Sequence, residues 1–265
     1  MTPRLPREFA RYVAIGDSST EGLEDPDGNG GYRGWANRLA AHVVAAQAKP
    51  LLYANLGVRG RKTREIRREQ LAQALSMHPD LVTVFAGVND IVRRDCDVPR
   101  VAADVEKMLR PLCDTGATVL TITMPDLGTV VPLARLMRSR LLALNDRVRA
   151  ISASTGTLCV DLASYPVTSD MRLWHPDRLH ANSEGHRRIA AALAEALGLP
   201  GHDHSWAEPL PSAPRKSVVR RAYDEWRWVR DYFVPWAWRH AHGISSGDGR
   251  TAKRPTLETV DESII

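Results

Sequence analysis

The sequence predicts an α/β fold built around a parallel sheet, and three features of the chain lead to that prediction. Short, apolar, β-prone runs alternate with longer helical patterns as far as about residue 198. Each short run is closed by Gly, Asn, Asp or Pro, as is typical of strands buried in a parallel sheet. The 265 residues, 43% of them hydrophobic, are enough for one sizeable core but few for two enzyme domains. We therefore expect an α/β sandwich with right-handed crossovers.

The expected strands are short apolar runs at residues 12–15, 51–56, 81–85, 118–123 and 157–161. The expected helices carry apolar residues at helical spacing and cover residues 35–48, 64–77, 98–113, 135–152 and 183–197. For five strands connected in this way we expect a parallel sheet with a flavodoxin-like strand order. Ligands of such sheets bind beyond the carboxyl ends of the strands, so that edge should carry the functional residues.

Residues 1–200 are expected to form this domain, and residues 201–265 a C-terminal extension of different character. The Pro- and Gly-rich stretch 198–214 has the composition of a linker or surface loop. An amphipathic helix should follow, with one apolar face made of Val219, Ala222, Trp226, Val229 and Phe233. Pro235 should kink or end that helix, and the polar tail 243–265 is expected to be partly disordered. Such a helix either covers the core domain, acts as a lid, or forms a belt in peripheral contact with a membrane.

The composition and the charge of the chain bear on its expected cellular location and on its expected binding partners. No run of about 18 apolar residues is present, so no transmembrane helix is expected. The N-terminal sequence lacks the apolar region of a secretory signal, and Cys96, Cys113 and Cys159 form no CxxC pair, so the cytoplasm is the expected location. Much of the excess of basic residues behind the net charge of +5 lies in residues 59–68 and 215–254. The second of these stretches also contains acidic residues. The charge alone therefore does not indicate nucleic acid, and no nucleic-acid partner is expected.

Residues suited to nucleophilic chemistry follow three of the predicted strands. Ser18, in the block GDSST, follows the first strand, where a helix N-terminus would point free N–H groups at the same spot. Gly57 closes the second strand and lets a backbone N–H approach a substrate, while Asn89 follows the third and can donate to a developing oxyanion. Taken singly, Ser18 and Asn89 are equally suited to cap helices and Gly57 to form a turn. Their combination indicates a site because the three strand ends open on one crevice.

A carboxylate and an imidazole lie on the loop between the fifth strand and the last helix. Asp177 and His180 are three residues apart, so the carboxylate can reach the imidazole. A serine nucleophile needs a base to accept its proton and an acid to orient that base. A lone Asp-x-x-His is also common on solvent-exposed loops without any catalytic role, and the position of this one after the fifth strand is what favours catalysis.

The blocks GDSST, NLG, GVND and DRLH, in this order and at these intervals, resemble the four signature blocks of the SGNH hydrolases, which are GDSL-like lipases and esterases. The resemblance spans about residues 10–198, although GDSST replaces the commoner GDSL. It implies a three-layer α/β/α sandwich and a serine esterase without a metal or organic cofactor. It also implies that Ser18 is the nucleophile and that Asp177 and His180 complete the triad. The oxyanion hole would consist of the N–H groups of Ser18 and Gly57 and the side chain of Asn89.

Two other patterns admit different mechanisms. Residues 243–247 fit the G-x-S-x-G nucleophile elbow, but no apolar strand precedes them, no helix is expected after them and no His lies downstream. Zinc could be bound by a cluster of His175, Asp177, His180 and His186. No HExxH or HxH spacing supports zinc, and the serine mechanism explains the same residues, so no metal is expected.

The predicted function is carboxylic-ester hydrolysis of a small-molecule or lipid ester. Arg59 and Arg61 follow the second block, and Arg93 and Arg94 the third, so they are candidates to bind a phosphate or carboxylate of the substrate at the mouth of the site. The alternative is a solvated helix face with pairs such as Arg61–Glu65. Two rival functions stay open. One is acyl transfer through the same triad, and the other is a non-catalytic module that binds anionic membrane or nucleic acid through the C-terminal segment.

Overall fold

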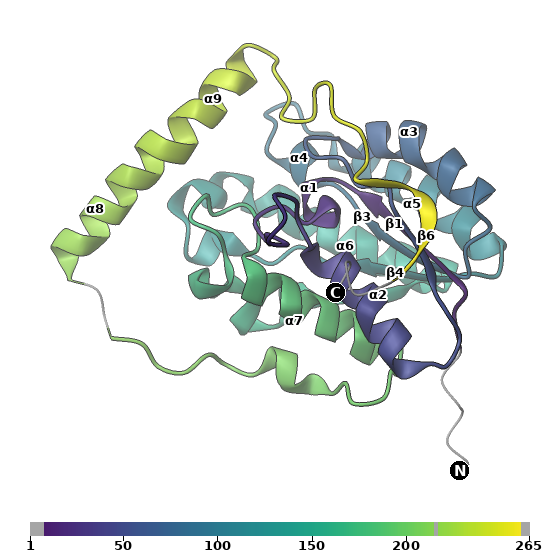
Figure 1. The fold of residues 1–265 in the computed structure, drawn as a ribbon. Coiled ribbons are helices and arrows are strands. Elements are labelled where there is room, and N and C mark those ends of the chain that lie inside the picture. Colours follow the sequence, from purple (N-terminus) through teal and green to yellow (C-terminus); the bar gives the residue numbers. More distant parts are fainter. Residues whose placement is uncertain (1–7, 215–216, 261–265) are drawn as a thin grey trace.

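One mostly parallel sheet organises the chain. The computed structural model describes residues 8–214 and 217–260, and within these ranges six strands pair in the order β5-β4-β3-β1-β2-β6 (Figure 1). The strands are β1 Arg11–Gly16, β2 Leu52–Asn55, β3 Leu81–Phe85, β4 Thr118–Ile122, β5 Leu158–Val160 and β6 Arg254–Thr259. The first five are parallel, so the predicted flavodoxin-like order is confirmed.

Helices cover both faces of the sheet because strand residues alternate between two apolar clusters. On one face, Val13 packs with side chains of α3 and α5, and on the other, Tyr12 packs with side chains of α2 and α7. The longer helices of this body are α2 Gly34–Ala46, α3 Thr63–Ser76, α5 Val98–Asp114, α6 Arg138–Thr155 and α7 Ser183–Ala196. Two short helices, α1 Ser18–Glu21 and α4 Val88–Ile91, follow β1 and β3 directly. The layers are those of the predicted α/β/α sandwich.

The tail expected to be partly disordered is ordered over residues 254–259, and its residues 261–265 lie outside the described part of the chain. The expectation of a five-stranded sheet is wrong, because residues 254–259 add a sixth strand. These residues form β6, which pairs antiparallel with β2, with Leu52 opposite Thr259. Without β6, β2 would be an edge strand with unpaired backbone groups, which is a ready template for another strand. Leu257 packs against one apolar cluster and Val260 belongs to the other, so the tail is anchored on both sides.

The C-terminal helix continues past Pro235 instead of ending there. Helix α8 (Val218–Trp228) passes through a π-helical turn (Val229–Phe233) into α9 (Val234–Ala241), and Figure 1 shows the three as one rod beside the α/β body. In the π turn, the N–H of Val234 donates to the carbonyl of Val229, five residues back. This wider turn immediately before Pro235 accommodates a residue that has no N–H of its own.

Four of the five residues of the predicted apolar face are exposed, and only Phe233 among the five is half-buried. Val219 is 80% exposed and Trp226 is 54% exposed, whereas Trp228 and Phe233 are half-buried. The expectation that the aromatic residues cover the core is therefore wrong for Trp226 and for Trp238, which is 56% exposed, and it stays a prediction for Trp228, Phe233 and Trp236. Peripheral membrane contact through the outer face stays a prediction, as does the domain division at residue 200. Among the helices of residues 8–214 and 217–260, none is long and apolar enough to cross a membrane.

Candidate active site

A tight strand–turn–helix places Ser18 at the carboxyl edge of the sheet. Strand β1 ends at Gly16, where an added Cβ would lie 2.5 Å from the carbonyl oxygen of Phe85. Asp17 caps α1 by accepting a hydrogen bond from the N–H of Ser19 at 3.1 Å. Ser18 is therefore the first residue of a helix that begins directly after β1. Its side chain is half-buried and lies in the wall of a cavity.

Ser18, His180 and Asp177 form one hydrogen-bonded chain. The Oγ of Ser18 lies 2.8 Å from Nε2 of His180, and Nδ1 of His180 lies 2.7 Å from Oδ2 of Asp177. The other carboxylate oxygen of Asp177 accepts from the backbone N–H groups of Leu179 and His180, at 2.9 and 3.0 Å. Burial alone would raise the pKa of Asp177, but hydrogen bonds from His175 and His180 outweigh it and hold this pKa well below its usual range. Asp177 is thus a carboxylate fixed toward the imidazole.

The two remaining signature residues lie beside α1, but their N–H groups are engaged. The backbone N–H of Gly57 donates to Oδ1 of Asn55 at 3.0 Å. An added Cβ at Gly57 would lie 2.8 Å from the N of Glu21, which explains why the position needs glycine. The side-chain amide of Asn89 donates to Oδ2 of Asp17 at 3.2 Å and to the carbonyl of Arg61 at 3.1 Å. The oxyanion role of Gly57 and Asn89 stays a prediction.

Asp17 is a buried acid that contacts Ser19 and Asn89. Burial raises its pKa to about 7, against the opposing hydrogen bond from Ser19 and the nearby His180. An aspartate in an unfolded chain titrates near pH ~3.9. Between those two values the folded chain keeps a proton that the unfolded chain has lost. The free energy of unfolding should therefore fall as pH rises through this window.

Replacing Asp17 with asparagine should remove that part of the pH dependence. Asp17→Asn loses one acceptor and is expected to be less stable at low pH, but it cannot ionise. Between about pH 4 and about pH 7, the free energy of unfolding of the variant should rise relative to that of the wild type. Urea unfolding of both proteins across that pH range measures this difference. Parallel curves for the two proteins would contradict a buried, proton-retaining Asp17.

A second histidine, which the sequence did not indicate as a partner of the acid, also contacts Asp177. Nδ1 of His175 lies 3.3 Å from Oδ2 of Asp177, and Nε2 of His175 lies 3.2 Å from Oε2 of Glu24. The hydrogen bond to Asp177 raises the pKa of His175 against the effect of burial. Ligand atoms of Glu24, His175 and Asp177 all lie within 4.8 Å of one another, the spacing of a metal cluster. However, the Asp177 Oδ2 atom that belongs to this cluster also lies 2.7 Å from Nδ1 of His180, so it is already engaged with the imidazole.

The fourth residue of the zinc hypothesis, His186, has a structural role. It is fully buried, its Nδ1 accepts from the N–H of Trp35 at 3.1 Å, and its Nε2 faces the carbonyl of Leu23 at 2.9 Å. Burial lowers the pKa of His186 to about 4, so the ring is neutral and links α7 to α2. The serine of the G-x-S-x-G pattern, Ser245, lies in a turn in which its Oγ accepts from the N–H of Gly247.

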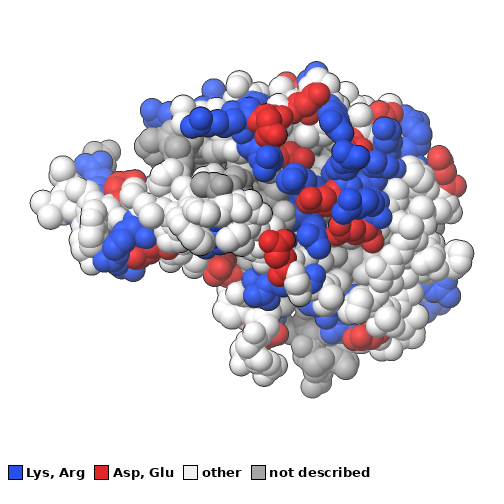
Figure 2. Space-filling model, turned by 90° about the horizontal axis from the view of Figure 1, so that it is seen from above, with Lys and Arg blue, Asp and Glu red and all other residues white. Residues whose placement is uncertain are grey.

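The arginines predicted to bind an anion have acidic partners on the protein or point to solvent. Arg59 pairs with Glu21, Arg61 with Glu69 and Arg93 with Asp95. Arg94 is exposed. Figure 2 shows basic side chains gathered on the face seen from above, with acidic side chains between them. None of these four arginines is among the described residues that line the cavity, so their substrate-binding role stays a prediction.

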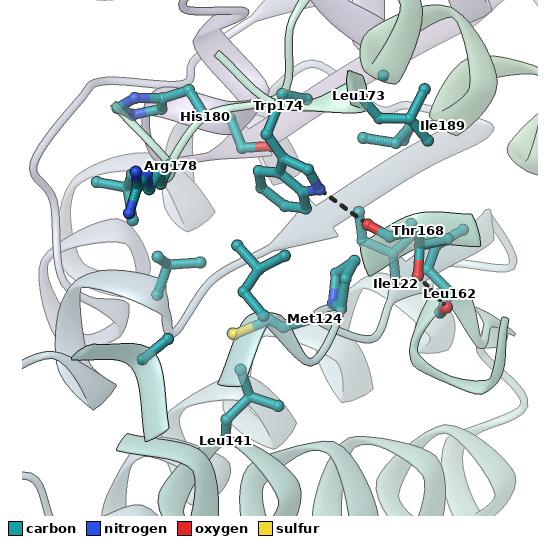
Figure 3. Close-up of a pocket in the computed structure, with 18 of the residues that line it drawn as sticks. Ile122, Met124, Leu141, Leu162, Thr168, Leu173, Trp174, Arg178, His180 and Ile189 are labelled. Atoms are coloured by element: carbon teal, nitrogen blue, oxygen red, sulfur yellow. Dashed lines mark hydrogen bonds between the residues drawn. The ribbon is translucent and has the colours of Figure 1, made fainter. Parts of the chain in front are cut away.

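An apolar cavity of about 160 Å³ opens beside Ser18 and His180. Its wall is formed mainly by side chains that follow β3, β4 and β5, including Ile91, Ile122, Met124, Leu141, Leu162, Val167, Leu173 and Ile189. In Figure 3, His180 and Arg178 lie at one end of the view and Ile122 and Leu162 at the other, with Trp174 between them. The indole of Trp174 donates to the carbonyl of Thr168 at 2.9 Å, which fixes the ring in the wall. No local pattern in the sequence indicates this cavity, because its residues come from separate segments between residues 17 and 206.

Residues 14–188 match the sequence pattern of the GDSL-like lipase/acylhydrolase family. The chain belongs to this family. The predicted resemblance to SGNH hydrolases is thereby confirmed, and the protein is a hydrolase that acts on ester bonds. No curated protein matches the chain.

Solved structures share the fold of this GDSL-like hydrolase at low sequence identity. LAE5, an alpha/beta hydrolase enzyme from the metagenome of Lake Arreo, Spain, is 24% identical with a TM-score of 0.59, over 71% of this chain and 95% of its own. A lipase/acylhydrolase from Enterococcus faecalis is 23% identical with a TM-score of 0.58, over 77% of this chain and 100% of its own. Axe2, an acetylxylan esterase from Geobacillus stearothermophilus, is 18% identical with a TM-score of 0.59, over 76% of this chain and 100% of its own.

Proposed function

We propose that this GDSL-like hydrolase cleaves carboxylic esters through a Ser18–His180–Asp177 triad and an acyl-enzyme. The observation that carries the proposal is the continuous hydrogen-bonded chain from Ser18 Oγ to the Asp177 carboxylate at the mouth of an apolar cavity. Ser18 lies within hydrogen-bond reach of His180, and His180 within reach of Asp177, which is the geometric requirement for a base to activate a serine.

The reaction divides into two acyl transfers. Ser18 Oγ attacks the ester carbonyl while its proton passes to Nε2 of His180, and the imidazolium returns that proton to the departing alcohol. Water then attacks the acyl-enzyme, giving its proton to His180, and Ser18 recovers a proton as the carboxylic acid leaves. Gly57 and Asn89 would stabilise the oxyanion by turning their N–H groups from their present acceptors, each contributing about 3 kcal/mol.

The cavity supports an apolar acyl group as the preferred substrate part. A cavity of about 150 Å³ lined by aliphatic side chains holds a molecule the size of benzene, and the cavity here is about 160 Å³. Burying each methylene of an acyl chain contributes about 0.8 kcal/mol. We infer a preference for acyl chains of medium length over acetyl, in contrast to the acetyl specificity in the name of Axe2.

A fluorophosphonate probe tests the proposal directly. Such probes phosphonylate only an activated serine, so the wild-type chain should be labelled at Ser18 and Ser18→Ala should not be labelled. The matched control is Ser245→Ala, which removes the serine of the G-x-S-x-G pattern and should label as the wild type does. Labelling lost in Ser245→Ala instead, or absent from the wild type as for a purely binding module, would contradict the proposal. Alcohol acceptors that capture the acyl group in place of water would identify the acyltransferase alternative.

A further inference from the structure

Helix α8 of the C-terminal extension contacts the loop that carries the catalytic acid and base. The indole N–H of Trp228 donates to the backbone carbonyl of Asp177 at 3.0 Å. The adjacent residue, Arg178, makes two hydrogen bonds to Glu225, at 2.7 and 2.8 Å. Its guanidinium also lies over the Trp228 ring, 4.7 Å from the ring centroid. Two neighbouring residues of the loop are thus held by one face of α8.

Arg178 occupies a backbone conformation that needs support. Its φ is +61°, in the left-handed region that non-glycine residues rarely adopt. The side chain is 14% exposed, whereas that of its partner Glu225 is 54% exposed. Arg178 lies between Asp177 and His180, so the path of the chain at Arg178 sets the spacing of carboxylate and imidazole. A strained residue in this position persists only where its surroundings hold it.

A third contact reaches the same loop from the turn that follows α8. The ring of Tyr232 packs edge-on against His175, with 5.7 Å between ring centroids. His175 in turn contacts the Asp177 carboxylate. The body-facing side of the helix therefore contacts the loop at His175, Asp177 and Arg178. Trp228 and Tyr232 are not among the described residues that line the cavity, so the helix acts on the loop and not on bound substrate.

The extension is an addition to the family's own domain. The family match ends at residue 188, and the solved structures above cover at most 77% of this chain. The loop 175–180 therefore receives, in this chain, contacts from residues outside the matched region. We propose that Trp228 is a positioning residue that, with the Glu225–Arg178 pair, holds Asp177 and His180 in the geometry needed to activate Ser18. This inference rests on the proposed triad.

Kinetics of two substitutions on α8 test the proposal. Trp228→Phe removes the indole N–H but keeps a ring beneath Arg178, and Glu225→Gln removes the charge that pairs with Arg178. Each should lower kcat for p-nitrophenyl hexanoate about 3- to 10-fold, the equivalent of one hydrogen bond, and change KM less than about 2-fold. Glu225 is largely exposed, so its substitution should leave the fold intact even if Trp228→Phe does not.

The matched control is Trp226→Phe, two residues away on the outer face of the same helix. Trp226 is 54% exposed and its ring faces Arg230, so this variant should keep the wild-type kcat and KM. A second readout is the ¹H resonance of the imidazole N–H of His180 that faces Asp177. This resonance should shift in Trp228→Phe and Glu225→Gln and stay in place in Trp226→Phe.

Each outcome of these measurements either supports or overturns the proposal that Trp228 positions the loop. A fall in kcat and a shifted resonance confined to Trp228→Phe and Glu225→Gln support positioning. An unchanged kcat in both, a rise in KM alone, or an equal loss in Trp226→Phe overturns it. Failure of the triad itself is a separate result, because Ser18→Ala would then retain activity whatever the α8 variants do.

Discussion

Ser18→Ala and His180→Ala are each expected to lower kcat/KM for ester hydrolysis by about four orders of magnitude or more, without unfolding the chain. Removing the hydroxyl deletes the nucleophile, and removing the imidazole leaves the hydroxyl without a base 2.8 Å away. Both side chains are half-buried at the cavity, so neither substitution opens a large void in the core. Steady-state kinetics with p-nitrophenyl esters, with circular dichroism as the check on folding, provide the measurement.

The double substitution Ser18→Ala/His180→Ala should be hardly slower than either single variant, because the two residues act as a unit. Ser245→Ala serves as the control for loss of an unrelated serine and should keep wild-type turnover. If Ser18→Ala kept nearly full activity, the result would contradict the proposed mechanism. Independent, multiplying losses in the double variant would show that Ser18 and His180 do not share one step.

The sheet and the meeting of Ser18, Asp177 and His180 could be predicted because each depends on a local pattern. Strands such as Leu81–Phe85 are continuous apolar runs with the predicted bounds, and five of them connected by helices allow few topologies. Ser18 follows the first strand directly, while Asp177 and His180 lie on one short loop. Their meeting required only that the carboxyl ends of parallel strands share one edge of the sheet.

Features that depend on contacts between distant segments could not be predicted. The sequence of β6 is polar and interrupted by Pro255, and it becomes a strand only because β2 offers an unpaired edge. The arginines after Gly57 and Asn89 suggested an anion site, but their acidic partners, such as Glu21 for Arg59, are visible only in three dimensions. The contact of Trp228 with Asp177 joins residues 51 positions apart, and no local pattern encodes it.

The preference for longer acyl chains should depend on the apolar cavity, and Leu141→Trp should abolish this preference. A hexanoyl ester has four more methylenes than an acetyl ester, and burying them is worth about 3 kcal/mol, or about two orders of magnitude in kcat/KM at most. Leu141, on α6, lines the cavity and lies below Met124 in Figure 3. A tryptophan there should fill space that the acyl chain needs, so hydrolysis of the hexanoate should fall at least about tenfold while that of the acetate changes little.

The next residue on the same helix provides the control for that substitution. Leu142 is 36% exposed and is not among the described residues that line the cavity, so Leu142→Trp should keep the preference of the wild type. The measurement is kcat/KM for p-nitrophenyl acetate, butyrate, hexanoate and octanoate with all three proteins. Because only the acyl chain differs among these esters, the ratio of hexanoate to acetate isolates its binding from the chemistry at Ser18. A ratio that is near one in the wild type, or that falls equally in both tryptophan variants, would mean that the acyl group binds elsewhere.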